Sequence, residues 1–248
     1  MANPIHQFEI HRWIELPLGS FDASFTNSSF AMLTAAVLSA GFLTLAMKKR
    51  AVVPDRVQVC AELFYEFVSK MVKLNIGKKG LHYLPFVFTI FVFVLLGNVL
   101  GLVPYMFTFT SHPIVTGALA LSVFITVFAF GLRNHGLHFF SLFLPPNVPW
   151  WLIPFIIPIE IISYFVRPLT HCVRLFANMM AGHIVLKVVA SFAVAAAGMG
   201  AAWTLLGAFP VLVNVAMMVF ELLVAVVQAY VFAILACVYL KDSVDLHH

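Results

Sequence analysis

Residues 151–190 read WLIPFIIPIEIISYFVRPLTHCVRLFANMMAGHIVLKVVA, an apolar stretch with recurring charged and polar side chains. At about 1.5 Å per residue, one helix of this length is about 60 Å long, roughly twice the hydrocarbon thickness of a bilayer. A second long apolar stretch, residues 203–240, follows a turn at Gly198-Met199-Gly200. Prolines such as Pro158 kink membrane helices without ending them. We therefore predict a long, strongly tilted antiparallel hairpin, with a break of each stretch into two spans as the alternative.

The composition of the whole chain is that of an integral membrane protein. Of its 248 residues, 62% are hydrophobic and 10% are charged, and the mean hydropathy is +1.02. Soluble domains carry about 25% charged residues. The three cysteines, Cys60, Cys172 and Cys237, are too scattered for a zinc site or a disulfide framework. We expect no metal and no cofactor, and the small net charge of +4 gives no indication of nucleic-acid binding.

Four further helical segments complete the predicted fold, which is all-α with about five membrane-embedded helices in a single polytopic domain, residues 1–248. After an outer N-terminal segment, 1–29, the chain has a span at 30–47, a surface helix at 55–74, and spans at 85–103 and 114–132. The positive-inside rule places Lys48-Lys49-Arg50 in the cytoplasm, and therefore the N-terminus outside. Five crossings then place the C-terminus in the cytoplasm, on the same side as Lys78, Lys79, Arg133 and Lys241.

The segment 55–74 is amphipathic. Asp55 suits the start of a helix. Its charged face carries Glu62, Glu66, Lys70 and Lys73, and its apolar face carries Cys60, Leu63, Phe64, Phe67 and Met71. Such a helix is expected to lie on the inner membrane surface, although a solvated linker helix has the same pattern.

Polar residues form one stripe along the 151–190 helix. They recur every three to seven residues: Glu160, Arg167, His171, Arg174 and Asn178. A polar stripe at membrane depth must face protein or water rather than lipid. In an antiparallel hairpin, Arg174 falls level with Gln228, and His183 falls level with Glu221.

Arg174 is the costliest member of the stripe, because an arginine side chain stays protonated in a protein. No carboxylate lies within one helical turn of it in the sequence. The missing anion therefore belongs to another subunit or to a substrate. Arg167, by contrast, can snorkel or pair with Glu160, and His171 can be an ordinary core histidine.

At this point the residues resemble those of a known family. Residues 174–183, RLFANMMAGH, closely resemble the signature of the ATP synthase subunit a family. The likeness runs from residues 6–8 to the final helix, and it includes GNVLGLVP at 97–104, PIEIIS at 158–163 with Arg167-Pro168, and Glu221 with Gln228. Some bacterial members exchange the histidine and glutamate of positions 183 and 221, and this chain is similar to the mitochondrial and related bacterial form. Its lead-in Thr170-His171-Cys172 departs from the family's usual pattern.

The resemblance implies a proton-channel stator that is not catalytic by itself and has two offset half-channels. In that role Arg174 would be essential for proton translocation. The implied outer half-channel comprises Asn178, His183, Asn214, Glu221 and Gln228. The implied inner half-channel comprises Glu160, Ser163 and Thr170.

The same resemblance implies the partners and the location. The partners would be a ring of c subunits with mid-membrane carboxylates, the peripheral-stalk b subunits, the lipid bilayer and, indirectly, the F1 sector. The expected location is the bacterial inner membrane, with the mitochondrial inner membrane as the alternative. Two other classes of function remain open: a secondary transporter of an anionic substrate, and a structural subunit of a respiratory complex.

Overall fold

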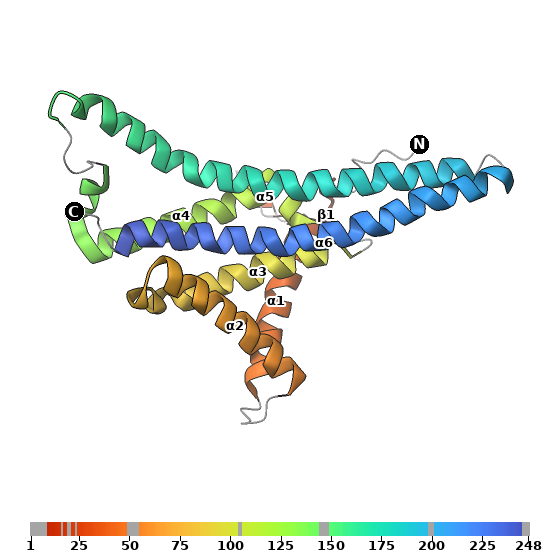
Figure 1. Ribbon diagram of the computed structural model, residues 1–248, viewed down its shortest axis with the longest axis horizontal. Helices are drawn as coiled ribbons and strands as arrows, with labels where there is room; N and C mark the ends of the chain where they lie inside the picture. The colour runs from red at the N-terminus through yellow and green to blue at the C-terminus, as the bar shows by residue number, and fades with distance from the viewer. Residues whose placement is uncertain are drawn as a thin grey trace. The chain divides into compact units, whose positions relative to one another are not determined.

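Six α-helices make up most of the computed structural model, which describes residues 9–15, 17–18, 21–22, 24–48, 55–103, 106–143, 149–197 and 201–244. The helices are α1 (Asn27–Lys48), α2 (Arg56–Asn75), α3 (Leu84–Gly101), α4 (Pro113–His135), α5 (Ile153–Ala197) and α6 (Ala201–Val244) (Figure 1). Short 3-10 helices lie at η2 (Lys78–Tyr83), η3 (Phe109–Ser111) and η4 (Gly136–Phe143). Within the described ranges, five helices are long and apolar enough to cross a membrane. The predicted all-α membrane fold is confirmed.

Helices α5 and α6 are the two long helices that the apolar stretches predict, with 45 and 44 residues. Both continue through their internal prolines, Pro158 and Pro168 in α5 and Pro210 in α6. Neither breaks into two spans, because the i→i+4 ladder closes again on either side of each proline ring. The predicted turn at 198–200 and the basic residues Lys49 and Arg50 lie outside the described residues.

The N-terminal segment contains short strands that the sequence did not predict. β1 (Arg12–Ile14) pairs antiparallel with β4 (Phe25–Thr26), and β2 (Pro17–Leu18) pairs antiparallel with β3 (Phe21–Asp22). Asn27, the first residue of α1, ties this segment down: its Oδ1 accepts from the His11 N–H, and its Nδ2 donates to the Glu9 carbonyl. Strands of two or three residues are too short to show a period of two.

The chain packs as two units that share four helices. Unit 1 comprises Met1–Ser39, Phe93–His112 and Leu175–Ala229, and unit 2 comprises Ala40–Val92, Pro113–Arg174 and Tyr230–His248. The boundaries fall inside α1, α3, α5 and α6, so each of these helices contributes one segment to either unit.

In unit 2, the first part of α5 is held to the last part of α6 by an ion pair. Arg167 donates to Asp242, Nη1 to Oδ2, over 2.5 Å. The guanidinium also lies 5.8 Å from the centre of the Tyr239 ring, within range of a cation–π contact. The partner of Arg167 is therefore Asp242 and not Glu160, because α6 extends beyond residue 240 and brings a carboxylate to this end of α5.

Helix α2 begins where predicted, and Asp55 is its N-cap, with the side chain accepting from the Arg56 N–H. Lys70 pairs with Glu66 on the exposed face, and this hydrogen bond lowers the pKa of the Glu66 carboxyl. The buried face is rotated from the predicted one: Val68 and Val72 are fully buried, whereas Leu63 is 60% exposed. The remainder of unit 2 covers only part of the apolar stripe, so its other flank stays open.

Candidate functional site

The buried polar pair of unit 1 consists of His183 on α5 and Glu221 on α6. Both side chains are buried, and His183 Nδ1 lies 3.7 Å from Glu221 Oε1. The antiparallel register predicts that these residues face each other, and the structure confirms it. Because imidazole and carboxyl groups both exchange protons, a facing pair of this kind can act as a relay.

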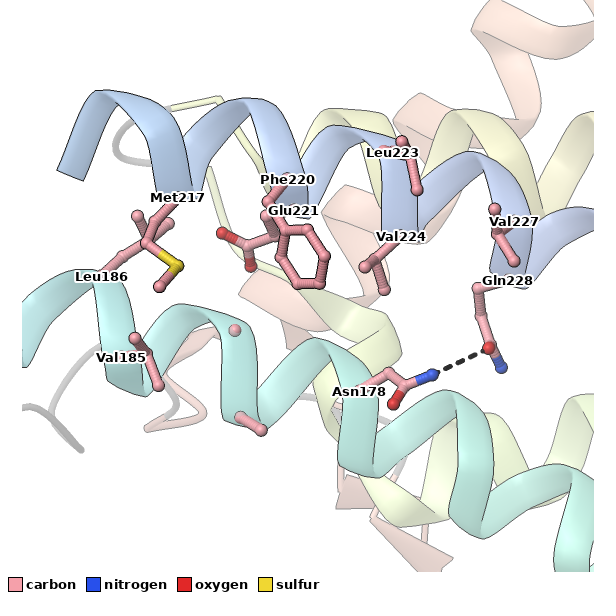
Figure 2. Close-up of a pocket in the computed structure, with 12 residues that line it drawn as sticks. Asn178, Val185, Leu186, Met217, Phe220, Glu221, Leu223, Val224, Val227 and Gln228 are labelled. Carbon is pink, nitrogen blue, oxygen red and sulfur yellow. Dashed lines mark hydrogen bonds between the residues drawn. The ribbon is translucent and has the colours of Figure 1, made fainter. Parts of the chain in front are cut away.

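Asn178 and Gln228 form a second polar level in unit 1. Asn178 Nδ2 donates to Gln228 Oε1 over 3.0 Å, as the dashed line in Figure 2 shows. The sequence register placed Gln228 level with Arg174. In the structure, Gln228 bonds instead to Asn178, one helical turn further along α5. The pairs 178–228 and 183–221 run in opposite directions along the chain, so α5 and α6 are antiparallel here.

These two levels border one pocket of about 600 Å³ between α5 and α6 (Figure 2). Its polar lining comes from Asn178, Glu221 and Gln228, and most of the remainder is aliphatic or aromatic, including Met217 and Phe220. A mainly apolar cavity with a few convergent polar groups is typical of a binding site.

Gly182 allows the Glu221 carboxyl to lie against the backbone of α5. A Cβ atom at residue 182 would stand 2.6 Å from Glu221 Oε1 and 2.9 Å from its Cδ. Real Cβ atoms do not approach oxygen so closely, so any larger residue at 182 must displace the carboxyl. The absence of a side chain at 182 is therefore part of the geometry that brings Glu221 to His183.

In the proton path that the sequence resemblance implies, replacing Gly182 by alanine is expected to lower the rate of proton transfer by roughly ten- to a hundredfold, because a displaced reacting group costs about that much. The protein should remain folded, since the displaced atoms are the free end of a flexible side chain. The rate of proton transfer across membrane vesicles that contain the protein measures the loss. The matched control is Gly117→Ala, whose new Cβ would make an ordinary contact 3.5 Å from Cys172 Sγ. Equal rates in the two variants would argue against a role for the carboxyl position.

Thr108, which the sequence analysis did not single out, contacts His183. It precedes η3 and is 1% exposed. Its Oγ1 lies 3.0 Å from His183 Nε2 and 3.1 Å from the Gly101 carbonyl oxygen. The only sequence signal is a group of hydroxyl residues, Thr108, Thr110 and Ser111, among aromatic residues.

The glycines of the G-x-x-x-G motif in α3 are packed by the segment that follows the helix. A Cβ at Gly97 would meet the Phe109 ring at 2.5 Å, and one at Gly101 would meet Thr108 Cγ2 at 2.6 Å. Between them, buried Asn98 donates through Nδ2 to the Ala225 carbonyl of α6 over 3.4 Å. Close packing is the predicted role of this motif, but the partner of its glycines is the returning chain.

Asn214 lies on α6 two helical turns before Glu221. It is half-buried, and its Oδ1 has no hydrogen-bond partner among the residues that the structure describes. It is not one of the residues that line the pocket. The structure therefore brings together four of the five predicted outer residues and leaves Asn214 beyond them.

Arg174 lies in unit 2, on an exposed face of α5. Exposed apolar side chains flank this face, among them Ile159 (61% exposed) and Val166 (41% exposed). Within the described part of unit 2, no carboxylate forms an ion pair with Arg174; Asp242, near the end of α6, pairs with Arg167. The structure thus leaves this cation open to a partner outside the chain.

The predicted inner residues follow the same face of α5. Ser163 and Thr170 are exposed, and Glu160 is half-buried. The Thr170 hydroxyl donates to the Arg167 carbonyl of its own helix. These residues form a surface stripe rather than an enclosed site. His171, by contrast, is 1% exposed, with its ring centre 3.7 Å from that of Phe232, which favours a role in the core.

Comparison with known proteins gives one consistent result. The family model described as ATP synthase A chain matches residues 29–241. The chain is 50% identical to the ATP synthase subunit a of Hyphomonas neptunium, over 99% of this chain and 98% of that one. It is 46% identical to the subunit a of Rhodospirillum rubrum and 48% identical to that of Paramagnetospirillum magneticum, over the full length of both chains in each case.

Proposed function

This chain belongs to the ATP synthase subunit a family, a membrane component of the F-type ATP synthase, and we propose that it is the proton-channel stator of its complex. In this proposal it forms two offset half-channels against a ring of c subunits that carry mid-membrane carboxyls. Proton flow through the half-channels turns the ring and drives ATP synthesis. The chain itself catalyses no reaction.

The observation that carries the proposal is the uncovered Arg174. On insertion scales, a charged residue at the bilayer centre costs about 2.5–3.5 kcal/mol, and such residues normally face protein or water. Here the cation lies on an exposed face of α5. In the most apolar part of this span, only 17% of the residues are buried by the rest of the chain, whereas 56% are buried in the span Lys78–Gly101. A second protein surface that bears a carboxylate would cover the exposed apolar side chains of α5 and pair with the charge of Arg174.

A passing ring carboxyl would change its protonation state at Arg174. In contact with lipid the neutral, protonated form is favoured, because burial in a low dielectric disfavours the charged form. Opposite a fixed guanidinium the anionic form is favoured, because an opposite charge within a few ångströms stabilises it. Each carboxyl therefore releases a proton on approaching Arg174 and takes one up on leaving it.

The two half-channels would supply and remove these protons. On the outer side, His183 and Glu221 relay protons, Asn178 and Gln228 shape the pocket beside them, and Asn214 lies nearer the outer end. On the inner side, Thr170, Ser163 and Glu160 form a polar stripe towards the cytoplasm. Each elementary charge that crosses gains about 2.3 kcal/mol per 100 mV. Several protons per turn therefore supply substantial work.

The orientation and the remaining partners follow from the same proposal. Four basic residues lie at or near the ends of spans: Lys48, Lys78, Lys79 and Arg133. Five crossings place these ends on the same side of the membrane, and the positive-inside rule makes it the cytoplasmic side. The N-terminus is then outside. The b subunits of the peripheral stalk would hold the chain still against the turning ring, and the F1 sector would be reached through them. The bacterial inner membrane is the favoured location over the mitochondrial one, since the compared relatives are bacterial.

Purification of the tagged chain from its native membrane in a mild detergent tests this function. We expect a ring of small c-type subunits, b-type subunits and a soluble ATPase to co-purify with it. Recovery of the chain alone, or with respiratory-complex subunits, while the ATP synthase is purified without it, would favour the transporter or the structural alternative.

A further inference from the structure

The contact between Thr108 and His183 determines which imidazole nitrogen carries the proton. A neutral histidine has one nitrogen that donates and one that accepts, and the assignment is made from the surrounding hydrogen bonds. Thr108 Oγ1 lies within hydrogen-bond distance of His183 Nε2, at 3.0 Å, and of the Gly101 carbonyl oxygen, at 3.1 Å. A hydroxyl group has one proton, so it can donate to only one of these two atoms.

The Gly101 carbonyl oxygen is the favoured acceptor of the Thr108 hydroxyl proton. Gly101 is the last residue of α3, and the last four carbonyls of an α-helix have no N–H partner within the helix. A carbonyl can only accept, whereas an imidazole nitrogen can also donate. The missing side chain of Gly101 allows the threonine to approach, because a Cβ there would stand 2.6 Å from Thr108 Cγ2. The hydroxyl thus caps α3, and its oxygen accepts from His183.

This arrangement fixes His183 with its proton on Nε2. In the neutral ring, Nδ1 is then the unprotonated nitrogen, and it is the atom that faces Glu221 Oε1 at 3.7 Å. That separation is slightly longer than a hydrogen bond, and a small rotation of the Glu221 side chain closes it. With the other tautomer, Nδ1–H would face the carboxyl and could not accept a proton from it.

We propose that Thr108 is a positioning residue, which caps α3 and holds His183 in the Nε2–H tautomer so that protons are exchanged with Glu221 at Nδ1 alone. The step is balanced: the Nδ1–H bond of an imidazolium breaks, an O–H bond forms on the Glu221 carboxylate, and both groups become neutral. Nε2–H stays bonded to Thr108 throughout. This inference rests on the proposed proton-channel function and adds a residue that sets which nitrogen of His183 exchanges the proton.

Three substitutions, made in the complete complex in membrane vesicles, test it. Thr108→Val keeps the shape but removes the hydroxyl, and Thr108→Ser keeps the hydroxyl. The matched control is Thr110→Val: Thr110 is also 1% exposed, but its hydroxyl has no hydrogen-bond partner within the described residues. We expect Thr108→Val to slow ATP synthesis by roughly tenfold, the lower end of the cost of removing the group that orients a functional histidine. The serine variant and the Thr110 control should stay close to wild type.

The tautomer itself is read by solid-state ¹⁵N NMR of histidine-labelled complexes, with His183→Gln identifying the His183 signals by difference. We expect protonated Nε2 in the wild type and in Thr108→Ser, and a mixture of tautomers in Thr108→Val. A slow Thr108→Val complex that keeps pure Nε2–H would overturn the inference, because the loss would then be only structural. Unchanged activity in Thr108→Val would overturn it too. Failure of the proposed function is distinct, because it appears as coupled ATP synthesis in Arg174→Ala vesicles.

Discussion

Replacing Arg174 by alanine is expected to abolish proton-driven ATP synthesis in membrane vesicles. Without the guanidinium, no positive charge stabilises the anionic form of a ring carboxyl at this point, so the carboxyl stays protonated as it passes. The control is Arg133→Ala, because Arg133 is an exposed arginine in the last turn of α4 and should tolerate the change. Synthesis is measured after an acid–base jump, with the amount of assembled complex determined in the same vesicles.

Lysine at position 174 is expected to fail nearly as badly as alanine. Its ammonium is a point charge that loses its proton readily when buried, whereas arginine stays charged and presents several donors in a plane. The comparison therefore separates a requirement for a permanent, delocalised cation from a requirement for any positive charge. Near-normal synthesis with lysine would mean that a simple charge is enough.

The second large effect is expected at the His183–Glu221 pair. Removing a positioned proton donor or acceptor typically costs about 10²–10⁴ in rate, so His183→Glu and Glu221→His should each lower ATP synthesis by roughly a hundredfold. The two changes together restore one acid and one imidazole on facing helices. We expect the double variant to work about tenfold faster than either single variant, because coupled residues are non-additive.

A double-mutant cycle tests this: the rates of the wild type, the two single variants and the double variant are compared. Each rate is divided by the amount of assembled complex. The Thr108 contact predicts that recovery is incomplete, since a carboxyl at position 183 has no ring nitrogen to donate to the Thr108 oxygen. A double variant in which the two losses multiply, to roughly ten-thousandfold below wild type, would show that the two residues act independently.

Much of this architecture is predictable because membrane spans obey simple physical rules. Length and composition predict five helices, and the hairpin register predicts that His183 faces Glu221, which the 3.7 Å separation bears out. The same register places Gln228 level with Arg174, one helical turn from its actual partner Asn178. The pairing of His183 with Glu221 could be predicted because both residues lie on regular helices that run side by side in opposite directions.

The features that sequence reasoning missed lie where no periodicity operates. Thr108 belongs to a short irregular segment, and only the folded chain shows that it returns to Gly101 and His183. Asp242 lies beyond the apolar run, so the extension of α6 and its ion pair with Arg167 had no hydropathy signal. The N-terminal strands are too short for alternation, and the buried face of α2 depends on which neighbours pack against it.

The central claim is that Arg174 separates two proton paths that communicate only through rotation of the ring. The most direct measurement is proton flux, driven by a potassium–valinomycin diffusion potential, through vesicles in which the rotor is covalently cross-linked to the ATPase head. Wild-type complexes should then be proton-tight, because a ring that cannot turn carries nothing. Arg174→Ala complexes should leak, because no fixed cation stands between the outer and inner paths. Arg174→Ala vesicles as tight as wild type, with the complex fully assembled, would contradict the claim.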